Sequence, residues 1–147
     1  MSTITEVTKT ANQLNTSYDV SKVALGNNEF ITADYTSTSA IDIAEGTVFG
    51  RIHATSKIAI LDKDASDGSA TPVGVFYNGI SGTKSVGATT TVTLTLINKG
   101  KVNAGKLAFA SGTTINSVVS SKQLRDYLND MGLVLETSTQ LSSLDNA

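Results

Sequence analysis

Apolar and polar side chains alternate most regularly along residues 89–98, where threonines separate Val92, Leu94 and Leu96. A period of two places these three side chains on one face, so the segment is predicted to be a half-buried strand. Residues 78–88 are rich in Gly, Ser and Lys and are expected to form a loop. Other short apolar runs bounded by turn residues predict further strands at residues 29–35, 46–53, 57–61, 71–77, 106–110 and 133–135.

One amphipathic helix is predicted near the C-terminal end of the strand-rich region. Its apolar residues are spaced i, i+3, i+4 and i+7, which places them on a single helix face. This face is interpreted as part of the core, with a share in a subunit interface as the alternative. The four residues are Leu124, Tyr127, Leu128 and Met131.

Residues that favour helix ends flank this stripe. Ser120 and Ser121 are N-cap candidates, and Ser120 and Gln123 have the spacing of a capping box. Gly132 stands where a helix commonly ends on a left-handed glycine. The chain is therefore expected to leave the helix at Gly132 and return to a strand.

The two ends of the chain are more polar than its middle. In residues 1–20 the apolar side chains are scattered and keep neither the helix nor the strand period, so this segment is expected to be a flexible arm. Residues 136–147 are expected to form a polar tail. The chain is thus divided into an arm (1–20), a β-rich domain (21–135) and a tail (136–147), and the predicted fold class is mainly β with one C-terminal amphipathic helix.

Composition excludes several classes of function. The chain of 147 residues has 11 basic and 13 acidic residues, so no excess of positive charge favours nucleic acid. No apolar segment approaches the roughly 20 residues that a membrane-spanning helix needs, and we expect synthesis in the cytoplasm without passage through a membrane. Because there is no Cys, neither disulfides nor thiolate metal sites can stabilise the fold.

Residues 100–106 match the spacing of a phosphate-binding loop, with glycines at 100 and 105 followed by Lys106. Leu107 replaces the hydroxyl residue that would hold Mg²⁺, and residues 106–110 are predicted to be a strand where the motif needs a helix. We therefore expect two glycine turns flanking a strand and no nucleotide cofactor.

Asp62, Asp64 and Ser66 have the spacing that begins a calcium-binding EF-hand loop. The glycine comes one position late, at Gly68, and Val73 stands where a bidentate glutamate belongs. A solvated turn is therefore expected, without a metal.

Catalytic residues are also scarce. His53 is the one histidine, and no partner for nucleophilic catalysis can be identified for it. Asp126 and Asp130 are spaced i, i+4 on the polar side of the predicted helix, but paired carboxylates need a walled cleft that so small a domain is not expected to form. The chain is not expected to be an enzyme.

An ordered set of motifs resembles the head decoration proteins of tailed bacteriophages. The set comprises residues 46–50 (GTVFG), Lys57 with its apolar run, residues 67–75 (DGSATPVGV), residues 100–104 (GKVNA) with Leu107, and residues 124–135 (LRDYLNDMGLVL). The similarity extends from about Gly46 to Leu135. The lambda head decoration protein is a more distant relative that lacks the C-terminal helix pattern.

The resemblance implies a β-clip-like fold and a homotrimer bound at three-fold positions on the outside of an expanded capsid. The implied partner is the major capsid protein of the same virus, and the implied effect is a more stable head. In such proteins the N-terminal arm commonly reaches the shell. The arm residues expected to contact the capsid are Ile4, Val7, Leu14, Tyr18 and Val20.

A carbohydrate- or receptor-binding module on a virion surface or fibre is the alternative function. Such modules commonly stack sugars on aromatic side chains, and this chain has no Trp and only four Tyr. A glycan-binding screen would separate this alternative from capsid decoration.

Overall fold

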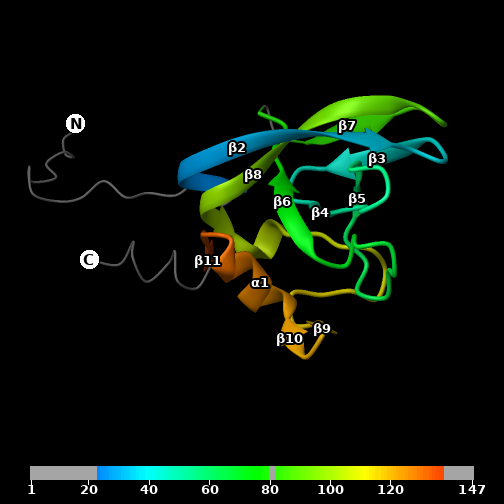
Figure 1. The fold of residues 1–147 in the computed structure, drawn as a ribbon. Helices are drawn as coiled ribbons and strands as arrows, with labels where there is room; N and C mark the ends of the chain where they lie inside the picture. Colours follow the sequence, from blue (N-terminus) through cyan, green and yellow to red (C-terminus); the bar gives the residue numbers. More distant parts are fainter. Residues whose placement is uncertain (1–22, 80–81, 138–147) are drawn as a thin grey trace, which may run out of the picture.

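The computed structural model describes residues 23–79 and 82–137, and its main feature is a six-stranded sheet (Figure 1). The strand order is β11-β8-β2-β5-β4-β6. These strands are β2 (Ala24–Thr36), β4 (Val48–Arg51), β5 (Ile58–Ile60), β6 (Pro72–Phe76), β8 (Thr91–Asn103) and β11 (Leu133–Glu136).

The sheet closes on itself through a second pairing of β8. One edge of β8 pairs antiparallel with β2 over the length of both strands, while β6 pairs with Leu96 and Ile97 on β8. The pairings of β8, β2, β5, β4 and β6 therefore form a closed ring. Strand β11 extends this ring by running parallel to residues 100–103 of β8, and its other edge carries no further strand among the described residues.

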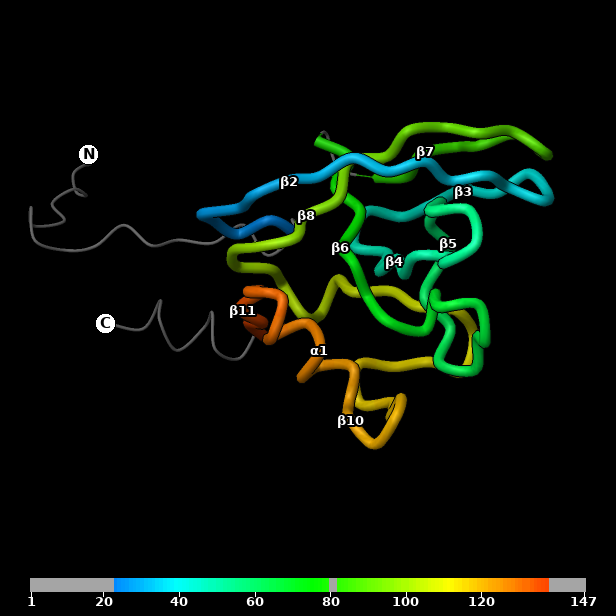
Figure 2. Tube along the Cα trace, viewed as in Figure 1, coloured from blue at the N-terminus to red at the C-terminus, as the bar shows by residue number. Residues whose placement is uncertain are grey.

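Two small antiparallel pairs and two short helices complete the fold. Strand β3 (Ile41–Ala44) pairs with β7 (Thr83–Val86), and β9 (Val118–Val119) pairs with β10 (Lys122–Gln123). The 3-10 helix η1 (Ala104–Lys106) follows β8 directly, and α1 (Leu124–Asp130) follows β10. The colours of Figure 2 show the chain passing from the β3 and β7 region to α1 and β11 at the opposite side of the ring.

The core consists of two clusters, and neighbouring residues of single strands contribute to different ones. Leu96, Phe49 and Phe76 belong to a cluster that includes Ile43 of β3 and Val86 of β7. Their neighbours Ile97, Val48 and Val75 belong to the other cluster, which includes Leu124 and Leu128 of α1. Since successive side chains of a strand point to opposite faces, β4, β6 and β8 are buried on both sides.

The predicted fold class is confirmed, because the described residues are mainly strands with a single α-helix near their C-terminal end. The clearest predicted strand is also confirmed within β8, where Leu94 and Leu96 are buried and Thr91 and Thr93 are exposed. The β-clip arrangement implied by the resemblance remains a prediction.

Two predictions about individual segments were wrong. Residues 78–88 were expected to be a loop, but they contain β7, which is polar except for Val86 and pairs with β3. Residues 106–110 were expected to be a strand, but Lys106 ends η1 and only Ala108 forms an isolated bridge, to Thr47. In both places partners distant in the sequence decide the backbone conformation, and local pattern does not report them.

The predicted capping box is wrong, whereas the predicted C-terminal glycine is confirmed. Ser120 and Ser121 form the turn between β9 and β10, and Gln123 takes the N-cap position without a side-chain hydrogen bond to the helix. Gly132 follows the helix at a φ of 103°, and its N–H donates to the carbonyl of Asn129 at 3.0 Å. Such a left-handed end favours glycine.

Candidate functional site

The helix stripe singled out from the sequence lies against the core. Leu124 and Leu128 are fully buried, and Tyr127 and Met131 are half-buried and pack against the same cluster. The phenolic O–H of Tyr127 donates to the carbonyl of Val119 at 3.1 Å. The stripe therefore joins α1 to both the core and the neighbouring hairpin.

The five arm residues singled out from the sequence, Ile4, Val7, Leu14, Tyr18 and Val20, lie outside the described residues. The first described residue, Val23, is buried, and its carbonyl accepts the Asn103 N–H at 2.9 Å. The arm therefore joins the domain at the end of β8 that also carries β11.

Three large apolar side chains are exposed within the described ranges, and they are the strongest candidates for contacts with other proteins. Phe30 on β2 lies beside Tyr77, with ring centroids 5.0 Å apart. Val134 lies on β11, at the edge of the sheet. Val118 is the most exposed of the three, at 58%, and lies on the β9–β10 hairpin.

The segment with the spacing of a phosphate-binding loop is divided between a strand and a short helix. Gly100 lies inside β8, where an added Cβ would come 2.5 Å from the Asn27 carbonyl oxygen. Gly105 and Lys106 belong to η1, and the Asn103 side chain accepts the Gly105 N–H at 3.0 Å. No loop is formed here that could wrap a phosphate at the start of a regular helix.

The carboxylates of residues 62–68 bond to their own loop. Asp62 accepts the backbone N–H of Asp64 at 3.0 Å, and Asp64 pairs with Lys63 at 2.9 Å. Asp67 accepts from both the hydroxyl and the backbone N–H of Ser69, at 2.6 and 3.0 Å, and these bonds lower the pKa of Asp67. These interactions are those of turns in which an aspartate bonds to the backbone two residues later.

No group of three His, Asp or Glu residues that could hold a metal ion occurs in the part of the chain that the structure describes. His53 is exposed, and its ring covers Gly68 so closely that an added Cβ would lie 2.3 Å from the ring carbon Cδ2. Its backbone N–H donates to the Asp67 carbonyl at 2.9 Å. His53 therefore packs over the turn at residues 67–69.

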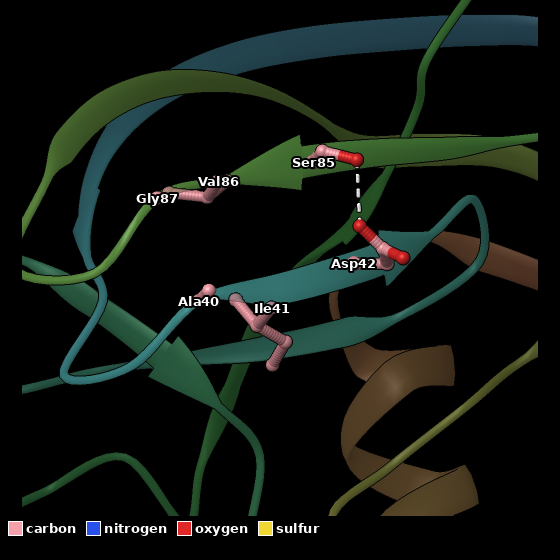
Figure 3. A pocket seen from close by; sticks show the side chains of 6 residues that line it. All are labelled: Ala40, Ile41, Asp42, Ser85, Val86 and Gly87. Carbon is pink, nitrogen blue, oxygen red and sulfur yellow. Dashed lines mark hydrogen bonds between the residues drawn. The ribbon is translucent and has the colours of Figure 1, made fainter.

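A hollow of about 340 Å³ lies along one end of the β3–β7 pair (Figure 3). Its one carboxylate, that of Asp42, already accepts the Ser85 hydroxyl at 2.6 Å. A single occupied carboxylate does not provide the acid and base that hydrolysis of a glycosidic bond requires. The lining residues are Ala40, Ile41, Asp42, Ser85, Val86 and Gly87.

Among the described residues, no helix is both long and apolar enough to cross a bilayer.

Comparison with known families gives one match. The family described as bacteriophage lambda head decoration protein D matches residues 10–124, about three quarters of the chain. The match includes all strands from β2 to β10 and stops at the first residue of α1, so most of the helix and β11 lie beyond it. No curated protein matches the chain.

Proposed function

Because the chain belongs to the bacteriophage lambda head decoration protein D family, we propose that it binds the outside of an expanded phage capsid as a homotrimer and stabilises the head. The observation that carries this proposal is the family match over residues 10–124. The family is structural, and its members belong to the virion capsid. The finer elements are the trimer, the three-fold positions, the outer surface and the absence of catalysis.

The fold supports a role in binding. Its exposed apolar side chains Phe30, Val118 and Val134 lie on three different strands, as a protein with several contacts requires. The carboxylates and the histidine at residues 53–69 are engaged within a turn. This arrangement offers surfaces for partners, and its described carboxylates form no acid–base pair in a cleft.

Stabilisation follows from mass action. A ligand that binds the expanded lattice and not the dissociated capsid protein shifts the equilibrium towards the intact shell. A trimer that contacts several capsomers also gains from multivalency, because each contact raises the effective concentration of the next. The proposed partner is the major capsid protein, and the proposed contact segment is the arm at residues 1–20, followed by the domain at residues 21–135.

Analytical ultracentrifugation and a head-stability assay test these elements separately. The purified protein should sediment as a trimer at micromolar concentration, and a monomer of 15.3 kDa throughout that range would contradict the trimer. Heads that lack the protein should release DNA at a lower temperature than heads to which it has been added. Equal release temperatures at saturating protein would contradict stabilisation.

A further inference from the structure

The β9–β10 hairpin projects from the body of the molecule, below α1 in Figure 1. It consists of two residues in each strand joined by Ser120 and Ser121. Val118 lies on this hairpin with 58% of its surface exposed. An apolar side chain is thus held away from the core by a protruding element.

The hairpin is fixed to α1 by several side-chain contacts. The Tyr127 hydroxyl bonds to the Val119 carbonyl at 3.1 Å, and Lys122 pairs with Asp130. The ammonium group of Lys122 also lies 4.6 Å from the centre of the Tyr127 ring. The main chain adds a bond of 2.9 Å from the Leu124 N–H to the Ser117 carbonyl. Val118 is therefore presented in a defined position, which reduces the entropy lost on binding.

The turn of the hairpin is strained. Ser120 and Ser121 have φ angles of 51° and 68°, in the left-handed region that is unfavourable for residues with a Cβ. Asn-Gly is the usual sequence for a two-residue turn of this kind. Strain of this type persists only where surrounding contacts impose it, and it often accompanies a functional surface.

An apolar pocket of about 280 Å³ lies close to the hairpin in the sequence. Its volume is just below the range of about 300–1,000 Å³ typical of pockets for drug-sized ligands, so it suits inserted side chains better than a cofactor. Leu107, Phe109 and Ile115 give it an apolar wall, and all three are half-buried. The lining residues are Ala104, Leu107, Phe109, Thr113, Thr114 and Ile115.

The pocket is formed in the single chain. Thr113 is buried, and its hydroxyl accepts the Lys63 N–H at 3.1 Å. The Ala110 N–H donates to the Leu61 carbonyl at 3.0 Å, and the Arg125 N–H donates to the Ile115 carbonyl at 2.9 Å. These bonds tie both walls to the body of the fold.

We propose that Val118 of one copy of this chain inserts into the pocket formed by Leu107, Phe109 and Ile115 of a second copy. The inference rests on the proposed function, because it assigns the subunit contact of the proposed trimer. A protrusion and a hollow on different patches of one surface give a head-to-tail contact, which closes into a ring when the rotation fits. Burial of Val118 and of the pocket wall supplies the apolar centre of that contact.

Charge complementarity supports a second copy as the occupant. Asp126 lies near the hairpin, where its charge contributes to the raised pKa of Lys122. Lys106 precedes Leu107 of the pocket, is exposed, and forms none of the ion pairs found within residues 23–79 and 82–137. The proposed contact lets Asp126 of one copy approach Lys106 of the other, and opposite charges at the rim favour that orientation.

Disulfide trapping tests the contact directly, since the chain has no cysteine of its own. Val118→Cys and Thr114→Cys are prepared as separate proteins, mixed and oxidised. The expected product is a cross-linked dimer that contains one chain of each kind, while neither protein alone cross-links. Val118→Cys mixed with Ser39→Cys, in the turn between β2 and β3, is the control and should stay uncross-linked. Cross-linking of Val118→Cys with itself would overturn the head-to-tail contact.

Sedimentation of two matched variants gives a second measurement. Val118→Asp should weaken self-association by at least 100-fold, whereas Val134→Asp, at a valine that is 51% exposed on β11, should leave it unchanged. Melting curves of both variants should match that of the parent, which shows that both are folded. A parent oligomer that survives Val118→Asp without Val118–Thr114 cross-links would overturn this contact and leave the proposed trimer standing. A parent that is monomeric at all micromolar concentrations would overturn both.

Discussion

Leu128 shows how a single buried side chain holds the helix in place. It is fully buried in the cluster that joins α1 to the sheet. Leu128→Ala should lower the free energy of unfolding by about 2–5 kcal/mol, because it removes buried apolar surface and leaves a cavity. Thermal melting measures the loss, and Asn129→Ala, at the exposed neighbouring position, is the control. Equal melting temperatures for Leu128→Ala and the parent would place the helix outside the core.

Asp67 is the residue at which pH acts most specifically. Its pKa is lowered chiefly by the hydroxyl of Ser69 and next by the Ser69 backbone N–H. A folded-state pKa below the unfolded value stabilises the fold above the unfolded pKa of about 4, and this contribution is lost as pH falls through the folded pKa. Ser69→Ala should raise the pKa of Asp67 in an NMR titration of the carboxyl group. An unchanged pKa would assign the shift to other groups.

At the scale of elements, the β9–β10 turn separates local preference from folded structure. Ser120 and Ser121 suit a helix start by residue type, but the chain uses them in a left-handed turn and begins α1 after Gln123. The double substitution Ser120→Asn and Ser121→Gly should therefore stabilise the protein by about 0.5–2 kcal/mol, since it relieves strain at both positions. Chemical denaturation measures this change. A lower unfolding free energy would show that the serine hydroxyls make contacts that outweigh the strain.

The elements that could be predicted are those whose own residues carry a clear pattern. Alternating Thr and Leu identified the centre of β8, and apolar spacing with Gly132 identified α1 and its end. Strand β7 was missed because only Val86 of its four residues is buried, so it shows no period of its own. The segment at 106–110 was misassigned because only Ala108 reaches a partner, Thr47, which lies far away in the sequence.

The candidate site could be predicted only in part for a related reason. Residues 118–119 form a strand of two residues, which is too short to show a period, and nothing local marks Val118 as exposed. The pocket is assembled from residues 104–109 and 113–115, and its wall depends on bonds to Lys63 and Leu61. Such a surface emerges only when the distant segments are brought together.

At the scale of the whole molecule, attachment to the head is divided between the arm and the domain. Deletion of residues 2–19 should leave the trimer and its melting temperature nearly unchanged, because the described core begins at Val23. It should weaken binding to heads more than ten-fold, or about 1.4 kcal/mol, if several backbone hydrogen bonds form between the arm and a strand edge of the shell. Quantitative binding to heads measures the loss, with deletion of residues 138–147 as the control. Full occupancy by the protein without its arm would refute the role of the arm.

Binding to isolated heads tests the central claim most directly. Purified protein is mixed with expanded heads and with unexpanded precursor heads, and each mixture is sedimented and analysed for the ratio of this chain to the major capsid protein. Decoration of the expanded lattice predicts saturation at a fixed ratio on expanded heads and little binding to precursor heads. Protein that stays in the supernatant with expanded heads, at concentrations well above micromolar, would contradict a function in capsid decoration.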